Sequence, residues 1–228
     1  MTTTTRRLGL SGPLLHHDDG RRLQRRLHAE VAAGGVDWAL VLCQHASVYT
    51  AGTSTRPGDL PTDGTPVTTV DRGGRITWHG PGQLVAYPIV RLPEPLDVVA
   101  HVRALEACLI TTCAAAGVRA ERVGGRSGAW VRGPHGDEKV GAVGVRVDQG
   151  VTTHGVALNC DADLGAFDRI VPCGIADAGV TSLTRASGRL VTVADVVYAL
   201  ESELVAYLAS ISPAPARHLA PVPAEARR

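Results

Sequence analysis

Cysteine is the residue type whose placement most directly predicts chemistry in this chain of 228 residues. Four of the five cysteines lie in apolar runs, where a buried and inert thiol is expected: Cys43, Cys108, Cys113 and Cys160. Cys173 lies instead between Pro172 and Gly174, which favours a sharply turned loop that presents the sulfur. Because the thiolate is the reactive form, a neighbouring lysine or histidine must lower the thiol pKa from about 8.5. We therefore predict that Cys173 is a nucleophile.

Lysine occurs once, at Lys139, whereas 22 of the 23 Lys and Arg residues are arginine. A guanidinium keeps its proton at any physiological pH, so a step that takes up and returns a proton near neutrality needs the lysine. Lys139 is therefore the candidate partner of the Cys173 thiol. Chance retention in an arginine-biased composition is the alternative that the sequence leaves open.

A glycine-rich segment, residues 72–83 (RGGRITWHGPGQ), precedes an apolar run of strand length. Four glycines and one proline in twelve residues exceed what a simple turn needs, and glycines let a backbone approach a ligand closely. The segment has no Gly-Lys-Ser/Thr ending, and it lacks the third glycine of a dinucleotide fingerprint. The pattern disfavours phosphate binding and favours another kind of ligand.

A run of small residues follows Lys139 in the segment 139–146 (KVGAVGVR). Regular strand alternation predicts that one face carries Lys139, Gly141 and Val143, and the other Val140, Ala142 and Gly144. Small side chains leave a slot beside the strand for an alkyl group, or they allow a helix to pack closely. Both explanations stay open at this point. A third segment, 152–159 (TTHGVALN), is predicted to be a strand that carries His154, and a single strand histidine is usually structural.

Together these segments resemble the lipoyl(octanoyl) transferase family. The resemblance lies in the glycine-rich segment, in Lys-x-x-x-x-Gly from Lys139, in His-Gly-x-Ala-x-Asn at 154–159 and in Pro-Cys-Gly at 172–174. It extends from Arg72 to Ser182 with the order and spacing of the family, and residues 48–52 (VYTAG) also look like its N-terminal signature. The match is specific and covers about half of the chain.

The resemblance implies an α/β (α+β type) domain, a mixed sheet with surrounding helices like the catalytic domain of biotin protein ligases and lipoate ligases. It implies that Cys173 takes an octanoyl group from octanoyl-acyl-carrier protein as a thioester and passes it to a lysine of a lipoyl domain. Lys139 would lower the Cys173 pKa and shuttle protons. The implied acceptors are the lipoyl domains of 2-oxoacid dehydrogenase complexes and the glycine cleavage H protein. Because a thioester donor makes amide formation downhill, no ATP, cofactor or metal is expected.

By the same resemblance, three segments line the acyl and thioester site. They comprise Arg72, Gly73, Gly74, Arg75, Ile76, Thr77, Trp78 and His79, then Ala142, Val143 and Gly144, and then Gly155, Val156 and Ala157. His79 or His154 would orient substrate or assist the base, and we favour positioning over general-base duty.

Three helices and several short strands must position these segments. Capping and apolar spacing predict helices from about residue 18 to Gly34, from Asp97 to Gly117 and from Thr192 to about Ser210. Strands are expected at 38–43, 47–51, 83–90, 120–123, 129–131, 140–147 and 151–159, with turn residues at 59–66. Gly150 is placed for a hairpin between the last two strands. Several strands follow one another too closely for helical crossovers, so the sheet must be mixed.

Length and composition predict one domain over residues 1–212, with a flexible Pro/Ala-rich tail at 213–228. A net charge of +1 argues against an extended nucleic-acid surface. No signal peptide and no apolar run near about 20 residues is found, which favours a cytoplasmic location without membrane contact. Five cysteines without a Cys-x-x-Cys spacing favour free thiols. A monomer is expected.

Three other functions fit parts of the pattern. An ATP-dependent lipoate or biotin ligase on the same fold would need no thiol nucleophile, and the Pro-Cys-Gly turn counts against it. A cysteine hydrolase could pair Cys173 with His79 or His154. A non-catalytic protein could bind acyl-carrier protein or lipoyl domains without turnover, but such a protein would not need both Lys139 and Cys173.

Overall fold

The structure is a computed structural model that describes residues 2–133, 136–170 and 178–212. Cys173 and its neighbours Pro172 and Gly174 lie outside the described residues, as does the segment 213–228. What the sequence predicts for these positions stays a prediction.

An eight-stranded sheet lies at the centre of the described chain. Its strands follow the order β1 (Thr3–Leu8), β2 (Trp38–Cys43), β6 (Gln83–Val90), β10 (Val151–Asn159), β9 (Gly136–Asp148), β8 (Arg126–Gly133) and β7 (Glu121–Val123), and β11 (Gly179–Val180) pairs with β9. β1 runs parallel to β2 and β11 to β9, whereas the other pairs are antiparallel. The predicted mixed sheet is confirmed. The β9–β10 hairpin turns at Gln149 and Gly150, whose positive φ angles of 49° and 74° suit a two-residue turn.

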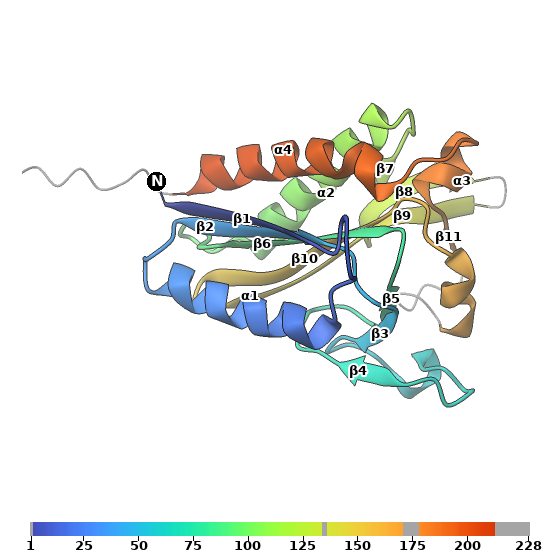
Figure 1. Cartoon of the computed structure of the whole chain (residues 1–228), viewed down its shortest axis with the longest axis horizontal. Helices are drawn as coiled ribbons and strands as arrows, with labels where there is room; N and C mark the ends of the chain where they lie inside the picture. The colour runs from blue at the N-terminus through green and yellow to red at the C-terminus, as the bar shows by residue number, and fades with distance from the viewer. Residues whose placement is uncertain (1, 134–135, 171–177, 213–228) are drawn as a thin grey trace, which may run out of the picture.

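Helices cover both faces of this sheet. Figure 1 shows α1 (His17–Ala32) on one side and α2 (Val98–Ala115) with α4 (Val193–Ile211) on the other. A short helix, α3 (Leu183–Ser187), precedes α4. Because the middle strands are covered on both sides, β2 and β6 are buried along their whole length. This explains why both are continuous apolar runs rather than alternating ones.

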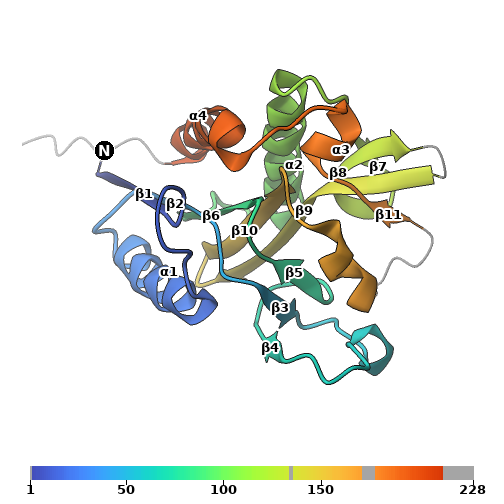
Figure 2. The same cartoon turned by 45° about the vertical axis from the view of Figure 1, so that its right-hand side comes forward.

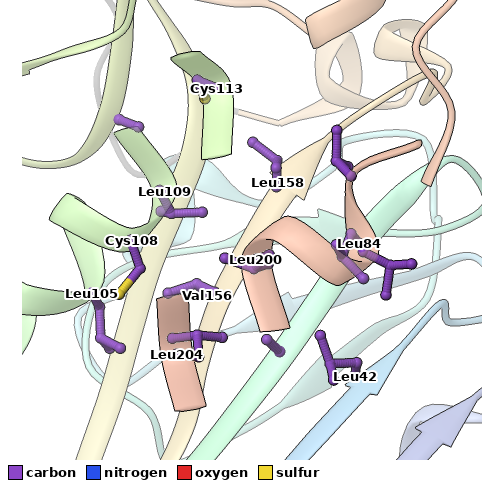
Figure 3. Close-up of a cluster of buried hydrophobic side chains, with 14 of the residues drawn as sticks. Leu42, Leu84, Leu105, Cys108, Leu109, Cys113, Val156, Leu158, Leu200 and Leu204 are labelled. Carbon is purple, nitrogen blue, oxygen red and sulfur yellow. The ribbon is translucent and has the colours of Figure 1, made fainter. Parts of the chain in front are cut away.

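The larger core lies between the sheet and the α2 and α4 helices. Figure 3 shows leucines of strands and helices meeting there: Leu42, Leu84 and Leu158 from the sheet, Leu105 and Leu109 from α2, and Leu200 and Leu204 from α4. A second core lies under α1, where Leu27 and Val31 pack with Val41 and Val85. Alternate residues of the middle strands thus serve opposite cores.

The helix boundaries follow the capping residues. The Asp97 carboxylate accepts a hydrogen bond from the Ala100 N–H at 2.8 Å, and Gly117, with φ +79°, follows the last turn of α2. At the start of α4, the Asp195 carboxylate accepts hydrogen bonds from the backbone N–H and the hydroxyl of Thr192, both at 2.7 Å. These bonds satisfy N–H groups that a helix end leaves without partners.

A smaller sheet lies on the α1 side of the central one (Figure 2). Its order is β4 (Val67–Thr69), β3 (Val48–Ala51) and β5 (Thr77–His79). Two 3₁₀ helices, η1 (Pro57–Asp59) and η2 (Leu164–Arg169), belong to the surrounding loops. A third apolar cluster joins this sheet to η2: Tyr49, Ile76, Trp78, Ala162, Phe167 and Ile170. The glycine-rich segment 72–83 is therefore anchored at β5.

Within the described residues, α2 is the one helix long and apolar enough to cross a membrane, by length and composition only. Its Leu105 and Leu109 are fully buried in the core between the sheet and α4. Its Glu106 is fully buried and forms ion pairs with Arg103 and Arg122. These are the contacts of a core helix.

Candidate active site

A cavity of about 520 Å³ lies between the central sheet and the smaller one. Its walls come from β9 and β10 on one side and from the glycine-rich segment on the other, with His17 of α1 and Val85 and Tyr87 of β6 completing them. The volume falls within the range of roughly 300–1,000 Å³ that is usual for sites of small ligands.

Most of the site residues predicted from the sequence line this cavity. They are Lys139, Arg72, Gly73, Gly74, Arg75, Thr77, His79, Ala142, Val143, Gly144, His154, Gly155, Val156 and Ala157. The structure brings these together from three separate segments. Other lining residues were not predicted as site residues, among them His17, Tyr87, Arg126 and Ser127.

Among the residues that the structure describes, Ile76 and Trp78 are the two predicted site residues that do not line the cavity. Strand alternation around β5 turns Thr77 and His79 towards the cavity and sends Ile76 and Trp78 into the third apolar cluster. There the Trp78 ring meets Phe167 edge to face, with ring centroids 5.6 Å apart. Their role is to anchor β5.

Lys139 reaches the cavity from β9, and its side chain is largely enclosed. The residue is 8% exposed, and its Nζ lies 4.6 Å from the ring centroid of Trp130, the residue opposite it on β8. An aromatic face at this distance attracts an ammonium group. Within the described part of the chain no carboxylate forms an ion pair with Lys139, so the ammonium remains available to a group in the cavity.

The predicted alternation along β9 is wrong because the strand contains an irregularity. Trp130 lies opposite Lys139 and the next residue, Ala129, lies opposite Gly141, so Val140 is an extra residue in β9. Such a bulge reverses the alternation beyond it. Val140 belongs to the core under α2 and α4, whereas Ala142 lies with Lys139 at the cavity.

The small residues of β9 and β10 serve both purposes that the sequence left open. A side chain at Gly141 would meet Leu109 of α2 at 3.1 Å, so this glycine allows close helix packing. A side chain at Gly144 would meet Arg72 Cδ at 3.1 Å, on the cavity side. Ala142 and Ala157 line the cavity itself and leave room beside the sheet.

Arg72 holds the glycine-rich loop in place. The residue is 8% exposed, and its guanidinium donates to the Thr50 carbonyl of β3 and to the Arg75 carbonyl, both at 2.8 Å. Gly74, with φ +83°, gives the loop a backbone conformation that other residues rarely adopt. Arg72 thus shapes one wall of the cavity as well as lining it.

His154 has a positive φ of 59°, which is uncommon outside glycine. Backbone strain of this kind is often found at functional sites. Its backbone N–H donates to Gln24 Oε1 of α1 at 2.8 Å, and its ring Nε2 lies 3.0 Å from Asp71 Oδ1. Burial lowers the pKa of His154, although Asp71 acts in the opposite direction. The imidazole is therefore neutral at pH 7.

Three further histidines gather beside the cavity, from α1, the loop after β2, and β5. Ring centroids lie 5.5 Å apart for His17 and His45, 6.1 Å for His45 and His79, and 6.5 Å for His17 and His79. Burial lowers the pKa of all three, that of His17 to about 4 and that of His79 well below its usual value. Among the described residues no group of His, Cys, Asp or Glu could hold a metal ion.

The four cysteines predicted to be inert are buried and free of disulfide bonds. Burial raises the pKa of each thiol, that of Cys108 to about 11 and that of Cys113 to about 12. None of them is a thiolate at neutral pH. The predicted nucleophile, Cys173, lies outside the described residues.

The described lining combines an enclosed ammonium with neutral imidazoles and an apolar wall. It suits a substrate with an apolar chain and a reactive carbonyl group, since Val143, Val156 and Ala157 offer hydrocarbon contact and Lys139 offers a proton.

Comparison with known proteins places the chain in a family. Residues 19–205 match the lipoyl protein ligase A/B catalytic domain. The chain is 59% identical to an octanoyltransferase of Clavibacter sepedonicus over 224 residues, which cover 96% of this chain and 97% of that protein. It is 56% identical to an octanoyltransferase of Salinispora tropica over 209 residues, covering 90% and 97%.

Solved structures share the fold at low sequence identity. The bipartite lipoate protein ligase of Thermoplasma acidophilum aligns with a TM-score of 0.65 at 17% identity, covering 91% of this chain and 84% of that one. A lipoate-protein ligase A bound with ATP aligns with a TM-score of 0.65 at 16% identity, covering 92% and 86%. From its match to the catalytic domain and its identity to these relatives, the chain belongs to the octanoyltransferases of the lipoyl protein ligase A/B catalytic-domain family.

Proposed function

We propose that this chain transfers an octanoyl group from octanoyl-acyl-carrier protein to a lysine of a lipoyl domain, through a thioester on Cys173. Family membership makes the chain an acyltransferase that moves octanoyl groups in protein lipoylation. The proposal adds the donor, the acceptor and the residues of the route.

The route has two acyl transfers. Before the first, the thiol proton of Cys173 passes to Lys139, which leaves a thiolate beside the Lys139 ammonium. In the first, the sulfur attacks the thioester carbonyl, and the bond from the acyl carbon to the carrier sulfur breaks. Lys139 returns the proton to the departing carrier thiol. In the second, the acceptor amine attacks the octanoyl-Cys173 carbonyl, the C–S bond breaks, and the proton lost by the amine returns to the Cys173 sulfur by way of Lys139.

The observation that carries this proposal is the position of Lys139 at an apolar cavity. Its side chain is 8% exposed, it contacts Trp130, and the same cavity is lined by Ala142 and Val156. A proton carrier beside an alkyl-binding wall is what acyl transfer from a thioester requires.

The donor and the acceptors complete the proposal. Octanoyl-acyl-carrier protein supplies the acyl group, and the acceptors are lipoyl domains of 2-oxoacid dehydrogenase complexes and the glycine cleavage H protein. We also infer a single catalytic domain over residues 1–212 that acts as a monomer. The 54–60% identity to octanoyltransferases favours a thioester donor over the ATP-activated acid of a ligase.

A transfer assay tests the proposed function. The purified chain is incubated with octanoyl-acyl-carrier protein and a lipoyl domain, without ATP, and the mass of the lipoyl domain is measured. We expect one octanoyl group on its lysine, and none with Cys173→Ala. Transfer that requires free octanoate and ATP would indicate a ligase. Release of octanoate to water in the absence of an acceptor would indicate a hydrolase.

A further inference from the structure

His79 stands at one end of a row of buried hydrogen bonds. Its Nδ1 lies 2.7 Å from Gln83 Oε1, Gln83 Nε2 donates to Asn159 Oδ1 at 2.9 Å, and Asn159 Nδ2 donates to the Thr181 carbonyl at 3.0 Å. Gln83 is 2% exposed and Asn159 5%. The row thus runs from the cavity wall into the protein interior.

The far end of the row sets the direction of every bond in it. A backbone carbonyl can only accept, so Asn159 must turn its NH₂ group to Thr181 and its oxygen to Gln83. Gln83 must then turn its NH₂ group to Asn159, and the same group also donates to the Trp78 carbonyl at 3.3 Å. The carbonyls of Thr181 and Trp78 thus fix the Gln83 NH₂ group on the side away from His79, and the Gln83 oxygen faces His79. His79 Nδ1 must carry the hydrogen.

This arrangement leaves His79 Nε2 as an acceptor. A neutral imidazole has one N–H, and the row places it on Nδ1. Burial and the neighbouring His45 lower the pKa of His79 well below its usual value, so the ring is neutral at pH 7. Both ring nitrogens of His45 have partners of their own, the Leu15 carbonyl at 2.9 Å and the Tyr87 hydroxyl at 2.7 Å. No described residue occupies His79 Nε2, and His79 lines the cavity.

The same row is tied to the strand of Lys139. The Thr181 N–H donates to the Lys139 carbonyl at 3.0 Å. Lys139, Gln83 and Asn159 also line a second cavity of about 20 Å³, the space of roughly one water molecule. The row of hydrogen bonds that orients His79 therefore also connects, through Thr181, to the backbone of Lys139.

We propose that His79 Nε2 accepts a hydrogen bond from the attacking primary amine of the acceptor, and that Gln83 and Asn159 are positioning residues that keep this nitrogen without a proton. The inference rests on the proposed function. The reacting carbonyl of a thioester offers only acceptors, whereas the amine brings N–H donors, so the amine is the matching partner. When one N–H is bound to His79, the lone pair of the amine nitrogen stays free to attack the carbonyl carbon.

The tautomer is tested directly by ¹⁵N NMR of the imidazole side chains in the unchanged chain between pH 6 and 8, with the His79 signals assigned by comparison with His79→Gln. We expect Nδ1 to be protonated and Nε2 unprotonated over this range. A proton on Nε2, or a doubly protonated ring, would overturn the inference whatever the activity.

The role is tested by measuring the two acyl transfers separately. The octanoyl-enzyme is first formed from octanoyl-acyl-carrier protein, and its decay is then followed on adding a lipoyl domain. We expect His79→Leu to slow the second step about 100-fold, the size of effect typical for losing one aligned polar group, with the first step changed less than about 3-fold. His79→Gln, which keeps an oxygen near the Nε2 position, should recover part of the loss.

A matched pair of amide-to-acid changes tests the positioning residues. In Gln83→Glu no N–H remains to bond Asn159 Oδ1, and the carboxylate beside His79 Nδ1 favours the doubly protonated ring, which has no acceptor at Nε2. We therefore expect a slower second step with a normal first step. Gln44→Glu is the control, since Gln44 Oε1 accepts from the Gly82 N–H at 2.9 Å and Gln44 does not line the cavity. A normal second step in His79→Leu overturns this inference alone. Absence of both steps in the unchanged chain overturns the proposed function as well.

Discussion

At the scale of single residues, the neighbours of Lys139 in the sheet determine where its side chain points. It lies across from Trp130 of β8, whose ring attracts an ammonium. Gly128, also on β8, lets that strand approach β9 closely, since a side chain there would come 2.4 Å from the Gly141 carbonyl oxygen. The lysine is therefore directed into the cavity rather than into solvent.

Replacing Lys139 by arginine tests whether proton transfer or charge matters. A guanidinium keeps the positive charge but does not release its proton near neutral pH. We expect Lys139→Arg to lower kcat for octanoyl transfer by about 100-fold or more, within the usual range for losing a general acid and base. The measurement is steady-state transfer to a lipoyl domain. Thermal unfolding of the variant serves as the folding control, and near-normal activity would refute the relay.

The position of Lys139 and the glycine-rich segment at one cavity agrees with what residue type and motif predict, whereas His17 and His45 were not predicted there. Lys139 is the sole lysine, and the glycine-rich segment has four glycines and one proline within twelve residues. His17 and His45 lie far from His79 in the sequence, and no motif links the three. The packing of α1 brings His17 to His79, and the pairing of β3 with β5 brings His45 there. Cys173 remains a prediction from its turn sequence.

At the scale of elements, the site depends on how closely β10 approaches β6. A side chain at Gly155 would lie 2.3 Å from the Ala86 carbonyl oxygen and 2.5 Å from Pro88. The residue before it, His154, has a positive φ, so the strand is locally distorted where it borders the cavity. A glycine is required because the nearest of these atoms, the Ala86 carbonyl oxygen, belongs to the backbone.

Gly155→Ala should therefore destabilise the protein by about 2–3 kcal/mol, the upper range for overpacking a buried site. The clash is with the backbone of a central strand, which cannot move away cheaply. Gly124→Ala is the matched control, since nothing lies within 4 Å of the added carbon. Urea unfolding followed by circular dichroism measures both. Equal stability of the two variants would show that β6 and β10 are more widely spaced.

Long elements with caps or continuous apolar runs were predicted well, whereas of the short strands only some were, among them β3 and β7. The three long helices and β2, β6 and β10 are confirmed close to their predicted bounds. β1, β4, β5 and β11 were missed because two to six residues carry little pattern, and such strands form only beside a partner strand. The bulge in β9 also escaped prediction, since it depends on pairing with β8.

At the scale of the whole molecule, buried neutral histidines couple folding to pH. Burial lowers the pKa of His17 and of His101 to about 4. In the unfolded chain a histidine titrates near its ordinary pKa of about 6.5. Between these values the unfolded chain binds more protons, so stability is complete above pH 6.5 and falls as the pH is lowered towards 4.

His101 allows this coupling to be tested away from the cavity. It lies on α2, and its Nδ1 is 2.7 Å from the Tyr207 hydroxyl of α4. Between pH 6.5 and 4 the unfolding free energy of the unchanged chain falls as the pH is lowered. In His101→Gln we expect this slope to be smaller by up to about 1.4 kcal/mol per pH unit. Urea unfolding at a series of pH values measures the slope. His16→Gln, at an exposed histidine, is the control, and an unchanged slope in His101→Gln would refute the assignment.

The central claim is that the acyl group passes through a thioester on Cys173. The most direct measurement is the intact mass of the chain after mixing with octanoyl-acyl-carrier protein alone, followed by peptide mapping. We predict one octanoyl group on Cys173, removed by hydroxylamine and by added lipoyl domain, and absent from Cys173→Ala. Octanoylation of the lipoyl domain by the Cys173→Ala variant, or an adduct on any other residue, would contradict the claim.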